Sequence, residues 1–85
     1  MESKVVFITG GSSGIGKSIG TFLTNKGCKV YGTTRNLENY PDFEPFTLIQ
    51  LDVKDVESIK KAVSDVVSKE GRIDVLINNA GVGIT

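Results

Sequence analysis

A glycine-rich stretch, TGGSSGIG, directly follows the short apolar run KVVFI, and it constrains the fold more than any other feature. The run at residues 4–9 is β-branched and apolar, which favours a buried strand. After the glycines, apolar side chains recur at helical spacing and predict one helix face with Ile15, Ile19, Phe22 and Leu23. A strand that turns through glycines into a helix leaves first-turn amides free, and such amides commonly bind phosphate.

The remainder of the chain alternates expected strands and helices. Gly27 ends the first helix, and a surface loop with two prolines spans residues 35–45. Asp55 can cap a second helix, which ends at Gly71. The apolar stripe of that helix consists of Val56, Ile59, Val63, Val66 and Val67. Further strands are expected at residues 28–33, 46–51 and 73–77.

Strands joined by crossover segments predict a parallel sheet with right-handed connections. The expected spatial order is 3-2-1-4, the order of a Rossmann-type doubly wound α/β sheet. In a finished sheet of this kind the fourth strand has a fifth beside it, because a bare apolar edge favours association. Residues 1–85 are therefore expected to form the N-terminal dinucleotide-binding part of a single Rossmann domain, with four strands.

Composition excludes several classes of function. Ten basic residues balance ten acidic ones, so no charge excess points to nucleic acid or to a membrane surface. Cys28 is the only cysteine, which rules out an internal disulfide and suits a cytoplasmic protein. The chain has no histidine, so we expect neither an imidazole metal site nor a His-based triad within it. No apolar run reaches membrane-spanning length.

The glycine stretch has two interpretations. In a dinucleotide site, Gly10 allows the turn, Gly14 allows close approach of a pyrophosphate, and Gly16 allows close packing of the helix on the strand. Ser12 and Ser13 could add hydroxyl donors, although Ser12 could instead cap the helix. The same letters also satisfy P-loop spacing from Gly11, which would place Lys17 on nucleotide phosphates. The letters TTR, LDV and NNAG at the other expected strand ends favour the first interpretation, because only a dinucleotide site uses all three.

These motifs, TGGSSGIG, LDV and NNAG, resemble the N-terminal motifs of the classical short-chain dehydrogenases/reductases, in order and spacing through essentially the whole chain. The resemblance implies an oxidoreductase that interconverts an alcohol and a carbonyl and forms a homo-oligomer at full length. It implies that the pyrophosphate and adenosine ribose are surrounded by Gly10, Ser12, Ser13, Gly14, Ile15 and Gly16. It places Asp52 and Val53 at the adenine, and Asn79, Ala80 and Gly81 at the ribose. An alternative for Asp52 is that it only forms a turn or a helix cap, and Asn78 is expected to tie strands together.

The end of the second strand carries the choice of cofactor. NAD-specific sites generally have an acidic residue there, which binds the ribose 2′-hydroxyl. This chain has Thr34 followed by Arg35, and an arginine can pair with a 2′-phosphate. We therefore predict NADP(H) rather than NAD(H). Two alternatives stay open: Arg35 could be only a solvated loop charge, and Glu38 could restore NAD binding.

The family's catalytic groups are expected to lie outside residues 1–85. Tyr31 and Tyr40 have no lysine four residues later, so neither begins the Tyr-x-x-x-Lys pair that the resemblance implies. We therefore assign no catalytic residue and expect the isolated chain to be inactive. An alternative function is a stand-alone dinucleotide-binding module that completes its sheet with another chain.

Overall fold

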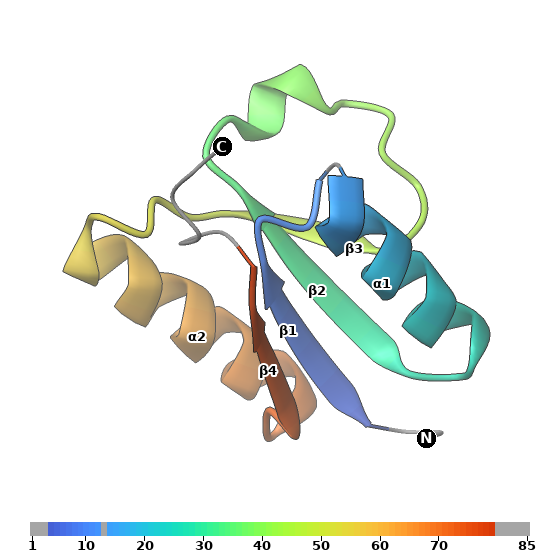
Figure 1. Ribbon diagram of the computed structural model, residues 1–85. Helices are drawn as coiled ribbons and strands as arrows, with labels where there is room; N and C mark the ends of the chain where they lie inside the picture. Colours follow the sequence, from blue (N-terminus) through green and yellow to red (C-terminus); the bar gives the residue numbers. More distant parts are fainter. Residues whose placement is uncertain (1–3, 13, 80–85) are drawn as a thin grey trace.

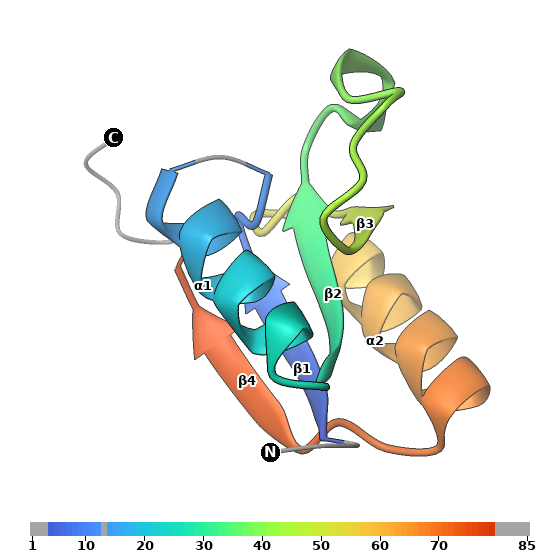
Figure 2. The same cartoon turned by 90° about the vertical axis from the view of Figure 1, so that its right-hand side faces the viewer.

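The computed structural model describes residues 4–12 and 14–79 and has three layers, with a central sheet between two helices (Figures 1 and 2). Helix α1 (Gly14–Asn25) covers one face of the sheet and α2 (Val56–Glu70) covers the other. The strands are β1 (Val5–Thr9), β2 (Lys29–Thr34), β3 (Thr47–Gln50) and β4 (Val75–Asn78). A short 3-10 helix, η1 (Leu37–Asn39), lies in the connection between β2 and β3.

The four strands form one parallel sheet in the order β3-β2-β1-β4, which confirms the predicted topology. Strand β1 is central: Ile8 pairs with Gly32 of β2 on one side and with Ile77 of β4 on the other. Because the strands are parallel, their carboxyl ends meet at one edge of the sheet, where the glycine stretch also begins. The structure therefore brings the three predicted motifs to the same edge.

Strand β1 is apolar without interruption because both of its faces are covered. Val5 and Phe7 point toward α2, where they pack in a cluster with Tyr31, Leu51, Ala62 and Val66. Val6 and Ile8 point toward α1, where they pack in a second cluster with Cys28 and Val30. The fold thus has a small core on each side of the sheet.

The helix faces predicted from periodicity are partly wrong. Ile15 is 71% exposed and Phe22 is 60% exposed, and α1 instead buries Gly16 and Gly20 beside Ile19 and Leu23. Glycine contributes nothing to a hydrophobic pattern, so the pattern misplaces a helix that approaches the sheet through glycines. On α2 the shift is similar, because Ala62 and Val66 are buried whereas Val56, Val63 and Val67 are exposed.

The predicted helix ends are confirmed. One carboxylate oxygen of Asp55 accepts hydrogen bonds from the amides of Glu57 at 3.0 Å and Ser58 at 3.5 Å, so it caps α2. Gly71 follows α2 with φ of 85° and donates its amide to the Val67 carbonyl. Gly27 follows α1 with φ of 93°. Each helix therefore stops at a left-handed glycine, as a C-terminal cap requires.

Two sets of polar contacts, one at Tyr31 and one at Asp74, lie away from the carboxyl ends of the strands. The Tyr31 hydroxyl donates to the Glu70 carboxylate at the end of α2. Burial, followed by this hydrogen bond and the nearby negative charge, raises the pKa of Tyr31 to about 12. The Asp74 carboxylate accepts from the Val5 amide and from Arg72, both at 2.8 Å, and these contacts lower the pKa of Asp74. Neither contact lies at the edge where the strands end.

Candidate functional site

The turn after β1 is held by one threonine of the neighbouring strand. Gly10 has φ of 71°, and its amide donates to the Thr33 hydroxyl at 3.0 Å. The next amide, that of Gly11, donates to the Thr33 carbonyl at 3.0 Å. Thr33 is only 2% exposed, so both bonds are shielded from water. This role of Thr33 was not predicted from the sequence, although a hydroxyl residue at the end of an expected strand is a signal that could have suggested it.

Gly16 brings the start of α1 against this turn. A Cβ atom at Gly16 would lie 2.4 Å from the Gly10 carbonyl oxygen and 2.8 Å from the Asn79 amide nitrogen. Both separations are far below van der Waals contact, so a side chain would push the helix away from the turn. The structure thus confirms that Gly16 permits close packing, here on the turn and on Asn79.

Among the described residues, none lies close to Gly14 at the start of α1. Gly14 has φ of 59°, and a Cβ atom built there would meet none of these residues within 4 Å. Neither acidic residue type occurs in this first turn, so no carboxylate on the helix offsets the positive end of its dipole. A helix N-terminus that is open and uncompensated can attract an anion. This geometry suits the predicted role of Gly14 and Ile15 beside a pyrophosphate.

The end of β4 is tied to the same turn. The Asn79 side-chain amide donates to the Gly10 carbonyl at 3.0 Å, and the Asn79 backbone amide donates to the Thr9 hydroxyl at 2.9 Å. That hydroxyl in turn donates to the Asn78 side-chain oxygen at 3.1 Å. Asn78 was expected to tie strands, and it does, but Asn79 does so as well. Its predicted contact with the ribose would therefore use its side-chain oxygen or its backbone carbonyl, because the backbone amide is engaged with Thr9.

Asp52 lies in a turn just after β3. One of its carboxylate oxygens accepts from the Lys54 amide at 2.9 Å, and its own amide donates to the Ser58 hydroxyl at 3.0 Å. Of the alternatives open from the sequence, the turn is therefore present. Asp52 and Val53 are both exposed. The turn directs Asp52 without burying it, and leaves its second oxygen available to a ligand.

Arg35 follows β2 directly and is exposed. Its neighbour Thr34 is 8% exposed, and the Thr34 hydroxyl accepts from the Asn36 amide at 3.4 Å. Within residues 4–12 and 14–79, the ion pairs all involve other residues, namely Lys60–Glu57, Lys61–Asp65 and Arg72–Asp74. The Arg35 guanidinium is thus unpaired in this part of the chain.

Three predicted site residues, Ser13, Ala80 and Gly81, lie outside the described residues.

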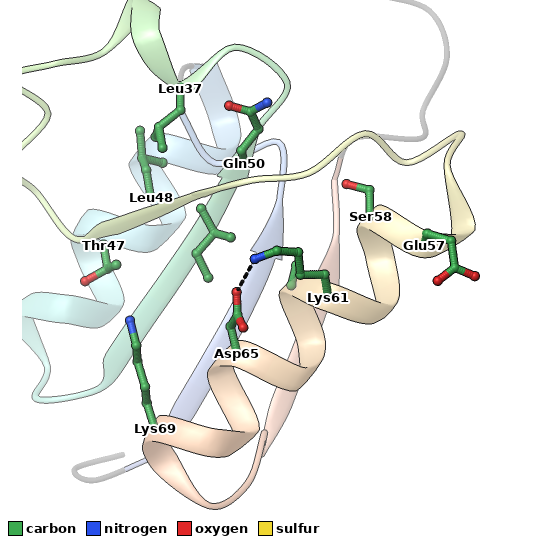
Figure 3. A pocket seen from close by; sticks show the side chains of 11 residues that line it. Leu37, Thr47, Leu48, Gln50, Glu57, Ser58, Lys61, Asp65 and Lys69 are labelled. Atoms are coloured by element: carbon green, nitrogen blue, oxygen red, sulfur yellow. Dashed lines mark hydrogen bonds and ion pairs between the residues drawn. The ribbon is translucent and has the colours of Figure 1, made fainter.

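A groove of about 580 Å³ lies elsewhere, along the outer edge of β3 (Figure 3). It runs between Leu37 of η1, the strand itself and α2, where Lys61 and Asp65 form an ion pair of 3.4 Å. None of the predicted cofactor residues lines it. We therefore place the candidate site at the strand ends, where the start of α1 and Arg35 follow neighbouring parallel strands, and not in this groove.

The described residues contain no group of three or more metal-ligating side chains that could hold a metal ion. In the same residues, neither helix has the length and apolar character needed to cross a membrane.

The fold defines an α/β protein with a Rossmann-type parallel sheet, and comparison with known proteins specifies the family. The family model for short chain dehydrogenases matches residues 4–85, and the chain belongs to this family. That membership excludes the P-loop interpretation of the glycines. It also confirms the resemblance predicted from the three motifs.

Relatives and solved structures agree with this assignment. A 3-ketodihydrosphingosine reductase of Bacteroides thetaiotaomicron is 40% identical over 84 residues, which are 99% of this chain and 30% of that protein. A 3-oxoacyl-(acyl-carrier-protein) reductase of Buchnera aphidicola is 36% identical over 88 residues, covering 96% of this chain and 36% of that protein. A 3-ketoacyl-(acyl-carrier-protein) reductase from Brucella melitensis, crystallised with NADH, matches with a TM-score of 0.85 and 30% identity, over 96% of this chain and 36% of that one. The chain thus spans about a third of the length of these relatives.

Proposed function

We propose that residues 1–85 form the N-terminal part of a single Rossmann domain and bind the adenosine-pyrophosphate half of NADP(H). The observation that carries this proposal is the pairing of two features at one edge of the sheet. The N-terminus of α1 is open and uncompensated, and an unpaired Arg35 follows the adjacent strand β2. The first feature suits a pyrophosphate and the second suits a further phosphate on the ribose.

The residues present fit a bound dinucleotide. The pyrophosphate would lie over the first turn of α1, near residues 10–16, where Gly14 leaves room for close approach. The adenine would lie near Asp52 and Val53, and the adenosine ribose near residues 79–81. The Thr33 bonds keep the Gly10–Gly11 peptides turned inward, so the loop is preorganised before a ligand arrives.

Arg35 is proposed to select NADP(H) over NAD(H). A carboxylate at the end of β2 would repel a 2′-phosphate, and Thr34 provides none. A guanidinium can form two charge-assisted hydrogen bonds to a phosphate. The Brucella melitensis structure holds NADH, so selectivity within the family has to be argued from this chain's own residues.

The whole protein is proposed to be an oxidoreductase that interconverts a small-molecule alcohol and a carbonyl compound in the cytoplasm, as a homo-oligomer. The nicotinamide of the cofactor supplies the hydride in such chemistry, and this chain holds the opposite half of the cofactor. The catalytic groups are proposed to lie outside residues 1–85. The relatives named above are all reductases, so we do not propose a stand-alone binding module.

Arg35→Asp tests the proposal through the affinities for NADP⁺ and NAD⁺, which differ only by the 2′-phosphate. The wild-type protein should prefer NADP⁺, and the variant should lose roughly tenfold to a hundredfold of that preference, as expected for a charged hydrogen-bonded pair. Arg72→Gln is the matched control, because the chain's other arginine lies next to Asp74, away from the strand ends. Titration calorimetry gives both affinities. An unchanged ratio in Arg35→Asp would refute the assignment of Arg35.

A further inference from the structure

We propose that Phe46 is a positioning residue for the cofactor site, and that it holds the glycine loop and the Arg35 loop (residues 35–46) in one fixed arrangement. This inference rests on the proposed function. Phe46 immediately precedes β3 and packs against the core cluster on the α1 side of the sheet. It takes no part in the predicted ligand contacts. Its role follows from what its ring touches.

The ring of Phe46 occupies a socket made by three glycines from three different segments. A Cβ atom at Gly20 of α1 would lie 2.4 Å from the ring, and one at Gly32 of β2 would lie 2.5 Å from it. A Cβ atom at Gly11, in the glycine loop, would lie 3.4 Å from the same ring edge. The socket exists because Gly20 and Gly32 lack a side chain, whereas a Cβ atom at Gly11 would only touch the ring and would clash instead with the Gly32 Cα atom at 2.9 Å. One aromatic ring therefore packs against the helix and the strand and lies next to the glycine loop.

The Arg35 loop is fastened to α1 at a second point through the same aromatic group. The rings of Tyr40 and Phe43 meet edge to face with centroids 6.4 Å apart, and those of Phe43 and Phe46 do so at 5.0 Å. The Lys17 ammonium lies 5.8 Å from the centre of the Phe43 ring, which is within cation–π range. The Arg35 loop thus packs on α1, the helix whose first turn is proposed to bind the pyrophosphate.

This arrangement couples two binding features that the backbone alone would leave independent. Arg35 is exposed and its loop contains only a three-residue 3-10 helix, so regular structure does little to fix that loop. Phe46 fixes the far end of the loop against Gly20 of α1 and Gly32 of β2, on the glycine-loop side of the sheet. A small shift of binding groups can greatly weaken the recognition of a ligand. Removal of the ring should therefore reduce selectivity for the 2′-phosphate in addition to stability.

Phe46→Leu and Phe7→Leu form a matched pair of variants. Both shorten a phenylalanine in the core, but Phe7 packs on the α2 side, in the other cluster. Thermal unfolding and titration calorimetry with NADP⁺ and NAD⁺ are measured for each variant. Phe46→Leu should lower the NADP⁺ to NAD⁺ affinity ratio by about tenfold, the scale of coupling between interacting groups. Phe7→Leu should lower the melting temperature and leave that ratio unchanged.

Combination with Arg35→Gln supplies a readout that a merely structural role would not move. If Phe46 positions the Arg35 loop, Arg35→Gln should reduce the ratio about tenfold less in the Phe46→Leu background than in the wild type. Gly20→Ala keeps the ring but fills its socket, and it replaces Phe46→Leu in the cycle if that variant does not fold. The same coupling is expected, because the added methyl group must displace the ring.

The outcomes separate this inference from the proposed function. If the wild-type protein binds neither NADP⁺ nor NAD⁺, the proposed function is wrong and the inference fails with it. If the wild type binds with the expected preference, but the Phe46 and Gly20 variants change only the melting temperature, Phe46 is purely structural and the inference alone is overturned. Additive effects of Arg35→Gln and Phe46→Leu would overturn it in the same way.

Discussion

The two helices cover opposite faces of one sheet, but they pack on it by different means. Helix α2 buries Ala62 and Val66 against Phe7 and Leu51, and its first turn is closed by the Asp55 carboxylate. Helix α1 buries Gly16 and Gly20, and its first turn opens onto free space. Helix α2 thus contacts the sheet through buried side chains. At its two buried glycines, helix α1 instead lets the backbone of the turn and the ring of Phe46 come close to the helix.

We interpret this difference as a division between an α2 side arranged for stability and an α1 side arranged for the proposed binding. A glycine within a helix destabilises it by roughly 0.5–1 kcal/mol relative to alanine. Helix α1 accepts this loss at Gly16 and Gly20, where the gain is close approach to the glycine turn and room for Phe46. Changes at the glycines of α1 should therefore alter binding strongly, and changes at the buried side chains Ala62 and Val66 of α2 should alter stability alone.

Gly16→Ala should produce the largest effect. The new Cβ atom would lie 2.4 Å from the Gly10 carbonyl oxygen, so the helix start and the turn must separate. We expect a loss of about 3 kcal/mol in unfolding free energy, the upper range for overpacking, because helix propensity offsets only part of the clash. Affinity for NADP⁺ should fall at least tenfold. Urea unfolding and calorimetry measure the two, with the exposed Ser18→Ala on the same helix as control. Near-native affinity of the Gly16→Ala variant for NADP⁺ would show that close packing of α1 is not needed for binding, and the proposed difference between the two helices would be wrong.

Val66→Ala tests the opposite face. Val66 is fully buried, so removal of two methyl groups should lower the unfolding free energy by about 2 kcal/mol. The affinity for NADP⁺ should not change, because the cavity lies on the α2 side of the sheet. Val67→Ala, at a neighbouring position that is 41% exposed, should lose less than half as much stability. A large change in affinity for folded Val66→Ala would show that the two faces are not separable.

Asp55→Ala tests the closed first turn of α2. The variant loses the carboxylate that accepts from Glu57 and Ser58, so unfolding free energy should fall by about 1 kcal/mol. Asp55→Asn retains a side-chain oxygen and should recover most of this loss. Urea unfolding provides the measurement. Equal stability of the alanine and asparagine variants would show that the side chain of residue 55 does not stabilise α2 as a cap.

The smallest effect at neutral pH concerns the Tyr31–Glu70 contact. The pKa of Tyr31 is raised to about 12, so the folded state disfavours the tyrosinate. Its contribution is fully present below the unfolded pKa of about 10 and is lost as the pH rises toward 12. In a Tyr40→Phe background, ultraviolet absorbance follows Tyr31 alone, and urea unfolding follows stability over the same pH range. Ionisation near pH 10 in the folded protein would contradict the buried contact.

The predictions from sequence succeeded where the cause is local. Gly10, Gly27 and Gly71 adopt left-handed backbone conformations that other residues rarely adopt. Asp55 caps α2 by accepting hydrogen bonds from the amides two and three residues after it. The strand order followed because parallel crossovers allow few topologies. The exposed faces of α1 and α2 were partly misplaced, because Gly16, Gly20 and Ala62 carry little or no hydrophobic signal.

The amino-acid sequence by itself determined that the protein has a parallel α/β fold, with a glycine-rich turn after the first strand and an arginine after the second. Only the tertiary structure decided how those pieces are held together. The Thr33 hydroxyl accepts a hydrogen bond from Gly10, 23 residues earlier, and the Asn79 side chain donates one to Gly10 across 69 residues. The Phe46 ring fills a space that is open because the facing residues are glycines. Such contacts depend on which backbones approach each other, and that approach is settled by packing of the whole sheet and not by the local sequence.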